Sequence, residues 1–371
     1  MAIYKSLVHK VSIHPDKKTK QKDYEKCGQL PIVDQGQLLI GGYSNALENR
    51  LICDLPVIVF GDHTRIVKYI NFPFGAGADG IKVLEPKESV LPKYLYYGTQ
   101  YLVLKLRDHG YARHYQFIEK MDLPIPSYSG QERIISRIEE LFSQLDASMA
   151  ELKTAKERLK VYRQAVLKEA FDICPEKIIL NSVCEHITDG DHMPPPKSET
   201  GIPFIMISNI QQNRINWSNT AYVNEHYYEN IGEKRRPKNG DVLYTVTGSF
   251  GIPVLVDFDK HFCFQRHIAL LRPNKSITQK YLYYAMQEPS VYSQASKMAT
   301  GTAQKTVGLS VLRKLIIPFI ESIKAQKAIV SKIEAQISVC DNIERAVSIA
   351  LQQAEALRQS ILKKAFEGGL V

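Results

Sequence analysis

The sequence predicts an α+β protein in which two globular segments alternate with two long helices. The first observation is a repeated stretch: residues 163–171 read RQAVLKEAF and residues 358–366 read RQSILKKAF. The second is that residues 131–171 align with residues 326–366 without a gap, with 14 of 41 positions identical. The third is that short β-type runs, separated by turns rich in glycine and aspartate, fill the segments between these copies. A tandem duplication accounts for all three observations.

Each copy has the pattern of one uninterrupted helix with a single apolar seam, and no proline or glycine interrupts residues 131–171. Each helix would be about 60 Å long. Two matching seams favour pairing of the copies over packing of each helix on its own domain, and we expect Tyr162, Val166, Leu357 and Ile361 to be buried. The predicted seams are Ile134, Ile138, Leu141, Leu145, Ser148, Leu152, Ala155, Leu159, Tyr162 and Val166, and Ile329, Ile333, Gln336, Cys340, Ile343, Val347, Ala350, Ala354, Leu357 and Ile361.

The duplication extends into the globular segments. KYLYY occurs at residues 93–97 and again at 280–284, where it predicts an amphipathic helix. The runs GIKVLEP and IALLRP, and likewise LPIVDQG and IPFIMIS, predict corresponding strands. The expected body is pseudo-two-fold symmetric, with domains over 1–129 and 173–322 and helices over 130–172 and 323–371.

The charge of the chain favours a polyanionic partner. Its net charge is +9, and most of the excess lies in the globular segments: residues 1–129 carry 17 basic and 13 acidic side chains, and residues 173–322 carry 16 and 13. The six cysteines are scattered, which is typical of reduced thiols in a cytoplasmic protein. There is no apolar run of membrane-spanning length, and the first residues lack the apolar core of a signal peptide.

No catalytic or cofactor motif withstands inspection. Residues 75–80 match G-x-G-x-x-G, but a strand-like run follows them instead of a helix, so we expect a tight turn. Asp189, Asp191 and His192 could ligate a metal, although a polar loop is the better interpretation, and we predict no metal site. Asp62 and His63 have no accompanying nucleophile. The chain also lacks an Asn/Asp-Pro-Pro-Tyr/Phe methyltransferase motif and a P-loop, so we expect a non-catalytic protein.

Along its whole length the chain resembles the specificity (S) subunits of type I restriction-modification systems. The resemblance lies in RQAVLKEAF and RQSILKKAF, in the helix entries IPSYSGQERIISRIEEL and IPFIESIKAQKAIVSKIE, and in GDVLYTVTGSFGIPVLV followed by TGTAQKTV. It implies two target recognition domains that each read half of a bipartite DNA sequence, and two antiparallel helices that act as a ruler for the unread spacer. It also implies a host-defence complex with two methyltransferase subunits and with restriction (translocase/nuclease) subunits. S-adenosylmethionine, ATP and Mg²⁺ would belong to those partners, and this chain would need no cofactor.

Candidate DNA contacts are the side chains in the unrepeated loops that carry planar donors and acceptors or positive charge. In the first domain they are Asp62, His63, Thr64, Arg65, Tyr111, Arg113 and His114. In the second they are Thr247, Ser249, Phe250, Gln265, Arg266, His267, Thr302, Gln304 and Lys305, with Lys234, Arg235, Arg236 and Lys238 as phosphate clamps.

Two other functions remain open from the sequence. One is a self-contained DNA methyltransferase or nuclease, which the missing motifs disfavour. The other is a coiled-coil scaffold or adaptor without DNA readout, which the basic excess of both globular segments disfavours.

Overall fold

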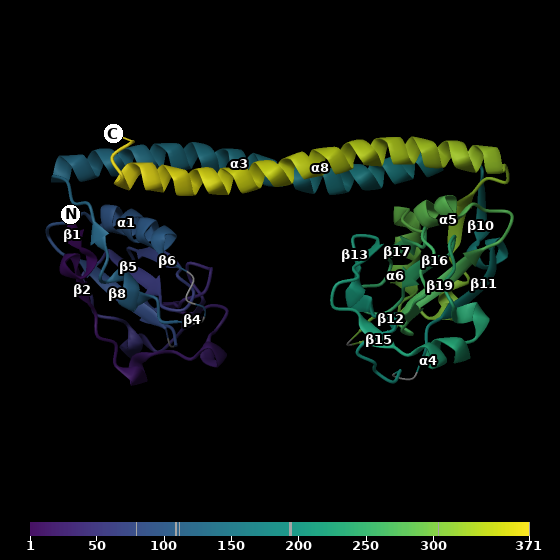
Figure 1. Cartoon of the computed structure of the whole chain (residues 1–371), viewed down its shortest axis with the longest axis horizontal. Coiled ribbons are helices and arrows are strands. Elements are labelled where there is room, and N and C mark those ends of the chain that lie inside the picture. Colours follow the sequence, from purple (N-terminus) through teal and green to yellow (C-terminus); the bar gives the residue numbers. More distant parts are fainter. Residues whose placement is uncertain (79, 108–109, 111, 193–194, 303, 371) are drawn as a thin grey trace. The chain divides into compact units, whose positions relative to one another are not determined.

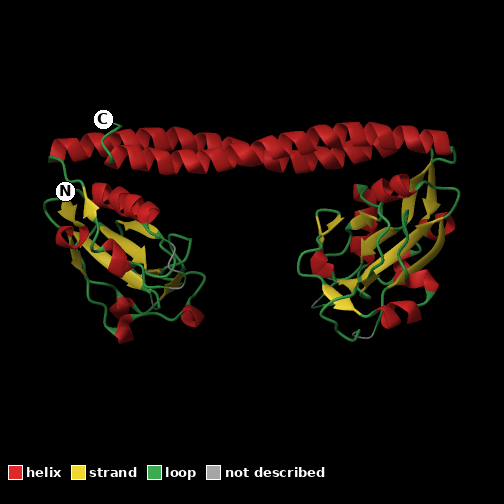
Figure 2. Cartoon of the chain, viewed as in Figure 1, coloured by secondary structure: helices red, strands yellow, loops and turns green. Residues whose placement is uncertain are grey.

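The chain divides into two compact units, each built from one globular domain and parts of two long helices. In the computed structural model, unit 1 comprises Met1–Lys153 and Ser348–Val371, and unit 2 comprises Thr154–Val347. The structure describes residues 1–370 except 79, 108–109, 111, 193–194 and 303. Figure 1 labels many of the elements, and Figure 2 colours the chain by secondary structure.

Unit 1 is an α+β domain with three small sheets. The four-stranded antiparallel sheet has the order β2 (Val8–Lys10), β8 (Ile81–Pro86), β5 (Val57–Gly61) and β6 (Val67–Ile70). The other two sheets are β4 (Gly42–Ser44), β3 (Leu30–Val33) and β7 (Gly75–Ala76), and β1 (Ala2–Ile3) with β9 (Asp122–Leu123). The helices are α1 (Pro92–Lys105) and α2 (Tyr115–Ile118).

Unit 2 repeats the three sheets with the same strand orders. Its four-stranded sheet is β11 (Cys184–Asp189), β19 (Ile268–Pro273), β16 (Val242–Thr245) and β17 (Pro253–Leu255). The others are β15 (Ala221–Val223), β12 (Ile202–Ile205) and β18 (Cys263–Phe264), and β10 (Glu176–Ile179) with β20 (Ile316–Phe319). A hairpin of β13 (Ile210–Gln211) and β14 (Arg214–Ile215) is an addition, and the helices are α4 (Glu225–Asn230), α5 (Gln279–Ala285), α6 (Pro289–Met298) and α7 (Leu309–Leu312).

The predicted long helices are confirmed as α3 (Tyr128–Asp172) and α8 (Ile323–Phe366). In unit 1 the first part of α3 meets the last part of α8, where the Arg358 guanidinium forms an ion pair with Asp146 and lies 4.3 Å from the centre of the Phe142 ring. In unit 2 the last part of α3 meets the first part of α8, where Arg163 lies 2.6 Å from Asp341 and 3.0 Å from Glu344. The two helices therefore run antiparallel.

The seam of this pairing follows the predicted one at most positions and departs from it near the repeated nine-residue stretches. Val166 and Ile361 are buried as expected, but Tyr162 is 49% exposed and Leu357 is 51% exposed, so their predicted burial is wrong. The inward residues are the next ones along, Arg163 and Arg358. An arginine can pack its aliphatic stem at a helix interface while its guanidinium reaches an acid, which hydropathy does not indicate. Of the remaining predicted seam residues, Ile138, Ile329 and Ile333 are buried, and Ile134, Leu145 and Leu159 are partly buried. Ser148 and Ile343 are exposed, so their place in the predicted seam is wrong.

A buried glutamine joins each long helix to its globular domain. Gln131 accepts from the Leu91 amide at 2.8 Å and donates to the carbonyls of Ser89 and Pro126, both at 3.2 Å. Gln326 accepts from the Thr278 amide at 2.8 Å and donates to two carbonyls, both at 2.9 Å. Because both glutamines satisfy backbone groups at the start of the KYLYY helix, they fix that helix against the long one.

The same helix faces carry the cores. In unit 1 Phe366 of α8 packs against Tyr94 and Tyr101 of α1, with ring centres 5.0 and 5.1 Å apart, and Gly98 leaves the room for this contact. In unit 2 Phe171 of α3 packs edge-on against Tyr281 of α5 at 5.3 Å. The repeated nine-residue stretches thus end in a buried aromatic anchor. In the part of the chain that the structure describes, no helix is both long and apolar enough to cross a membrane.

Candidate nucleic-acid interface

In unit 2 the predicted readers gather at the turn that follows β18. Gln265, Arg266 and His267 form this turn, with the Ile268 amide bonded to the Gln265 carbonyl at 3.0 Å. The Gln265 side-chain amide lies 2.9 Å from the His267 Nδ1, so a hydrogen bond holds both planar groups in place. Arg266 is exposed, and its backbone amide donates to the Asp191 carbonyl at 3.1 Å. The turn therefore presents one extended cation beside two oriented hydrogen-bonding groups.

A surface hollow of about 410 Å³ brings other predicted residues to this turn. Thr247 and Gln304 line it together with Arg266 and His267. The Lys305 carbonyl accepts from the Gly248 amide at 2.9 Å, which ties the two predicted loops to each other. Ser249, Thr302 and Lys305 are exposed beside them. Phe250 instead stacks on Tyr292, with ring centres 5.7 Å apart, and packs against the hydrophobic core of unit 2. Its ring therefore supports the loop.

A second hollow of about 310 Å³ adjoins the first and shares His192, Arg266 and His267 with it. Phe204 and Met206, at the end of β12, contribute apolar lining, and Lys197 also lines this hollow. His192 and Lys197 were not predicted as DNA contacts, because a single histidine or lysine in a polar loop carries no signal of its own. His192 lies 2.8 Å from Asp189, and among the described residues no group of metal-ligating side chains is present.

Asp191 belongs to the support of this surface. It accepts a hydrogen bond of 2.5 Å from the Tyr227 hydroxyl. Burial and the Asp191 charge raise the pKa of Tyr227, so the phenol stays protonated and donates. The bond fixes α4 against the loop that carries His192, and the polar-loop interpretation of Asp189, Asp191 and His192 accounts for their contacts.

In unit 1 two predicted contact residues are buried, and the structure corrects their role. Asp62 is 2% exposed, accepts from the Tyr115 amide at 2.9 Å and lies 3.2 Å from the Lys82 ammonium. His114 is fully buried, and its Nδ1 lies 2.9 Å from the Asp62 carbonyl oxygen. Both side chains brace the loops from inside, so neither presents an edge to a ligand.

The other predicted residues of unit 1 lie at the surface. Thr64 is exposed, and its hydroxyl donates to the Gln35 carbonyl at 2.7 Å. His63 and Arg65 are partly exposed in the same β5–β6 turn, where Arg65 has φ 61°, and Arg113 is exposed on a neighbouring loop. Gln35, whose side-chain Oε1 also accepts a hydrogen bond from the His63 amide at 3.4 Å, was not predicted as a residue of this surface. Tyr111 lies outside the described residues.

The basic cluster of unit 2 is mostly occupied by its own loop. Arg236 donates to the carbonyls of Ile231 and Glu229 and lies 5.2 Å from the centre of the Tyr228 ring, so it is better described as a brace than as a phosphate clamp. Lys238 forms an ion pair with Glu233 at 2.8 Å, and Arg235 lies 3.7 Å from Asp189. Lys234 is exposed, and its role as a phosphate clamp stays a prediction.

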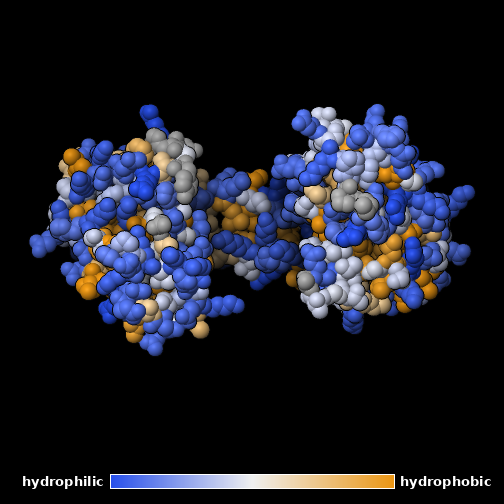
Figure 3. Space-filling model, turned by 90° about the horizontal axis from the view of Figure 1, so that it is seen from below, coloured by the Kyte–Doolittle hydropathy of each residue, from blue (hydrophilic) through white to orange (hydrophobic). Residues whose placement is uncertain are grey.

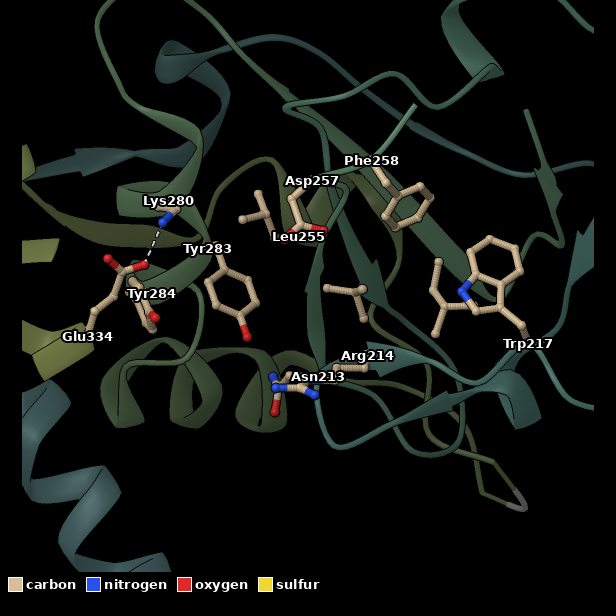
Figure 4. A pocket seen from close by; sticks show the side chains of 12 residues that line it. Asn213, Arg214, Trp217, Leu255, Asp257, Phe258, Lys280, Tyr283, Tyr284 and Glu334 are labelled. Atoms are coloured by element: carbon tan, nitrogen blue, oxygen red, sulfur yellow. Dashed lines mark hydrogen bonds and ion pairs between the residues drawn. The ribbon is translucent and has the colours of Figure 1, made fainter. Parts of the chain in front are cut away.

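Hydrophilic side chains cover much of the face that each unit turns away from the long helices (Figure 3). A different hollow of unit 2, of about 440 Å³, is shown in Figure 4. There Lys280 and Glu334 form an ion pair at 2.7 Å, and the Tyr283 hydroxyl points toward Asn213. None of the predicted DNA contacts lines this hollow, so it is separate from the candidate interface.

Comparison with known proteins connects these surfaces to a family. Residues 176–353 match the model of the type I restriction modification DNA specificity domain. The chain is 27% identical over 277 residues to the EcoBI specificity subunit of Escherichia coli, which covers 67% of this chain and 58% of that protein. It is 25% identical over 274 residues to the EcoKI specificity subunit of E. coli K12, with the same coverage. The matches thus span about 58% of the length of these relatives.

Solved structures share the whole fold. A chain from work on complex assembly and conformational transition of the type I R-M system has a TM-score of 0.70 at 18% identity, covering 100% of this chain and 97% of that one. The crystal structure of the HsdS subunit from Thermoanaerobacter tengcongensis has a TM-score of 0.51 at 17% identity, covering 100% and 96%. With the duplicated α+β units and the antiparallel helices, these findings show that the chain is related in sequence and in fold to the specificity subunits of type I restriction-modification systems.

Proposed function

We propose that this chain is the DNA-specificity subunit of a type I restriction-modification complex, in which each unit reads one half of a bipartite site. The observation that carries the proposal is that the two units share strand orders while different side chains occupy corresponding loop positions. A framework that is kept while its loops change suits two readers of two different sequences.

Hydrogen bonds identify the corresponding loop positions. The Asp62 amide donates to the Gly80 carbonyl at 2.6 Å in unit 1, and the Val246 amide donates to the His267 carbonyl at 2.9 Å in unit 2. Gly80 of unit 1 thus stands where unit 2 has His267. Because one position has no side chain and the other has an imidazole, the two units would present different patterns of donors and acceptors to a major groove.

The antiparallel helices would set the length of DNA between the half-sites and would bind two methyltransferase subunits. Apolar side chains remain exposed along them, although apolar residues on a paired helix are usually covered. These are Val161 at 71%, Tyr162 at 49%, Val339 at 56%, Ile343 at 44%, Ile349 at 48% and Leu357 at 51%. Restriction subunits would join the same complex.

The proposal assigns no catalysis to this chain. S-adenosylmethionine, ATP and Mg²⁺ would be bound by the methyltransferase and restriction subunits, and the described residues contribute only positioning and recognition.

Genome-wide mapping of methylated adenines, in a host with and without the gene for this chain, tests the proposal. We expect a split motif, with two short defined halves and a fixed undefined gap, that is methylated only when the chain is present. If removal of the chain changes no methylated motif, the proposal is wrong. If a gel shift with partner methyltransferase subunits also shows no DNA binding, a scaffold without DNA readout takes its place.

A further inference from the structure

Two adjacent leucines stand in solvent at the tip of the loop between β3 and β4. Leu38 is 71% exposed and Leu39 is 50% exposed. Burial of a leucine side chain stabilises a protein, and an exposed pair contributes none of that stabilisation. We call these two residues the Leu38–Leu39 tip.

The tip is held by a buried cation. Lys68 on β6 is 5% exposed, and its ammonium donates to the Leu38 carbonyl at 2.5 Å and to the Asp34 carbonyl at 2.7 Å. Its Nζ also lies 3.5 Å from the Asp34 carboxylate, and burial lowers the pKa of Lys68. Burying an ammonium is unfavourable unless it is well paired, so the fold incurs a cost in order to fix the backbone of Leu38.

This device is absent from the corresponding position of unit 2. Lys68 pairs with Val59 in the β5–β6 ladder, and Val254 pairs with Leu243 in the β16–β17 ladder. Val59 and Leu243 correspond because they pair with Val83 and Leu270, which lie three residues before the prolines that end β8 and β19. Lys68 is therefore a feature of unit 1 and not of the framework that the two units share.

The surroundings of the tip have the chemistry of a DNA contact. Gln35, in the same loop, holds Thr64 and His63 through the two hydrogen bonds described above. The segment before β3 carries exposed lysines, including Lys20, Lys22 and Lys26, and Tyr24 in this segment bonds to Asp34 at 3.4 Å. An apolar tip between hydrogen-bonding residues and lysines matches proteins that insert an aliphatic wedge between base pairs.

We propose that the Leu38–Leu39 tip inserts at a base step of the half-site bound by unit 1 and unstacks it. This inference rests on the proposed function, because it takes double-stranded DNA as the ligand of unit 1. Recognition by unit 1 would then depend on how easily that step deforms, in addition to the base edges read by Thr64 and Arg65. Unit 2, which has a valine in place of Lys68, would read its half-site without this distortion.

The test uses the full chain assembled with its methyltransferase subunits, and a duplex that carries the mapped site. 2-Aminopurine replaces one base at a time through both halves, never the methylated adenine, because its fluorescence rises on unstacking. We expect a rise at one step of one half-site, and at least about a three-fold smaller rise with the Leu38→Ala/Leu39→Ala double variant. Affinity should fall about ten-fold with an unchanged salt dependence, because no phosphate contact is lost.

Ile52→Ala is the matched control, since Ile52 is 89% exposed in the same unit and lies in another loop. It should leave the fluorescence and the affinity at the wild-type values. The inference is overturned if the double variant keeps the full rise, or if the wild-type complex binds the duplex without a rise at any position. Failure of the wild-type complex to bind the mapped duplex would contradict the proposed function, and the wedge with it.

Discussion

Units 1 and 2 differ least where they meet the long helices and most at their loops. Lys93 pairs with Glu139 at 2.6 Å in unit 1, and Lys280 pairs with Glu334 at 2.7 Å in unit 2. The glutamine anchors, the terminal phenylalanines and the arginine–aspartate pairs repeat in the same way. Five of the 14 positions that are identical in the two helix copies thus make the same kind of contact within each unit.

The loops show the opposite behaviour. Unit 1 has an ion pair between the buried Asp62 and the partly exposed Lys82 at its candidate surface. At the corresponding positions unit 2 has Val246 and Ala269, which pack in its apolar core. After the duplication, the residues that attach each domain to the helices therefore stayed the same, and the residues of the candidate ligand-binding surface diverged.

The largest expected effect comes from breaking the shared attachment. Gln131→Ala or Gln326→Ala removes three hydrogen bonds and leaves a buried amide and two carbonyls unpaired, which should lower the free energy of unfolding by about 3 kcal/mol. Urea denaturation measures the loss, and hydrogen exchange at the Leu91 and Thr278 amides shows which unit opens.

Gln287→Ala serves as the control, since the Gln287 side-chain amide donates to the carbonyl of Tyr283, only four residues before it, at 3.3 Å and so makes a local contact. It should change stability by less than about 0.5 kcal/mol. If only one of Gln131→Ala and Gln326→Ala lowers the free energy of unfolding, the attachment does not contribute equally to the stability of the two units.

Much of the fold could be predicted because a long helix repeats its hydropathy pattern over many residues. A gapless repeat with a heptad stripe predicted both long helices to within a few residues of their ends. The seam was misassigned at Tyr162 because hydropathy predicts the wrong residue here. The polar Arg163 lies at the helix interface, and the more apolar Tyr162 beside it is exposed. Only the partner acids of Arg163, far away in the sequence, explain its position.

The candidate interface could be predicted only as residue types in variable loops. Arg266 and Thr64 could be predicted because they are polar and lie in turns, and both are exposed. Asp62 and His114 have the same signal and are buried, because the packing of one loop on another decides which side chain faces outward. Gln35 was missed since its role depends on contact with the β5–β6 turn.

The next effect distinguishes residues that contact DNA from residues that stabilise their own loop. Arg266→Ala and Arg65→Ala should each weaken DNA binding by about 2 kcal/mol, a loss of roughly 30-fold, because an arginine contact to a base edge or phosphate would be removed. A gel shift with the partner methyltransferase subunits measures the change. Wild-type affinity in both variants would contradict the placement of the interface.

Arg236→Ala is the matched arginine substitution in unit 2. Because its guanidinium bonds to its own loop, the variant should lose stability in unit 2 and keep the salt dependence of DNA binding. A reduced salt dependence with unchanged stability would restore Arg236 as a phosphate clamp.

A smaller effect tests whether the two helix pairings are equivalent. Arg358→Ala and Arg163→Ala should each cost about 1 kcal/mol, because partly exposed ion pairs are screened by water. The double variant Arg163→Ala/Asp341→Ala should lose less stability than the two single variants added together, because both remove the same ion pair. A double-mutant cycle in urea measures this coupling, and a coupling of zero would show that the pair contributes nothing to the pairing.

The smallest effect is a pH dependence that belongs to unit 2 alone. Burial and the nearby Arg272 lower the pKa of His186 below its ordinary value of 6.5, and its Nε2 lies 3.1 Å from the Lys234 carbonyl. The unfolded chain then binds more protons than the folded one as pH falls from 6.5 to the folded pKa, so stability decreases through that window and changes no further below it. His186→Gln should reduce this decrease, measured as the shift of the unit 2 urea midpoint between about pH 7.5 and about pH 5.5.

His9→Gln is the control, because His9 is the corresponding histidine of unit 1. It pairs with Glu85 on β8, and Glu85 corresponds to Arg272, the partner of His186 on β19. A unit 2 midpoint that responds to His9→Gln as strongly as to His186→Gln would show that the two units do not unfold independently.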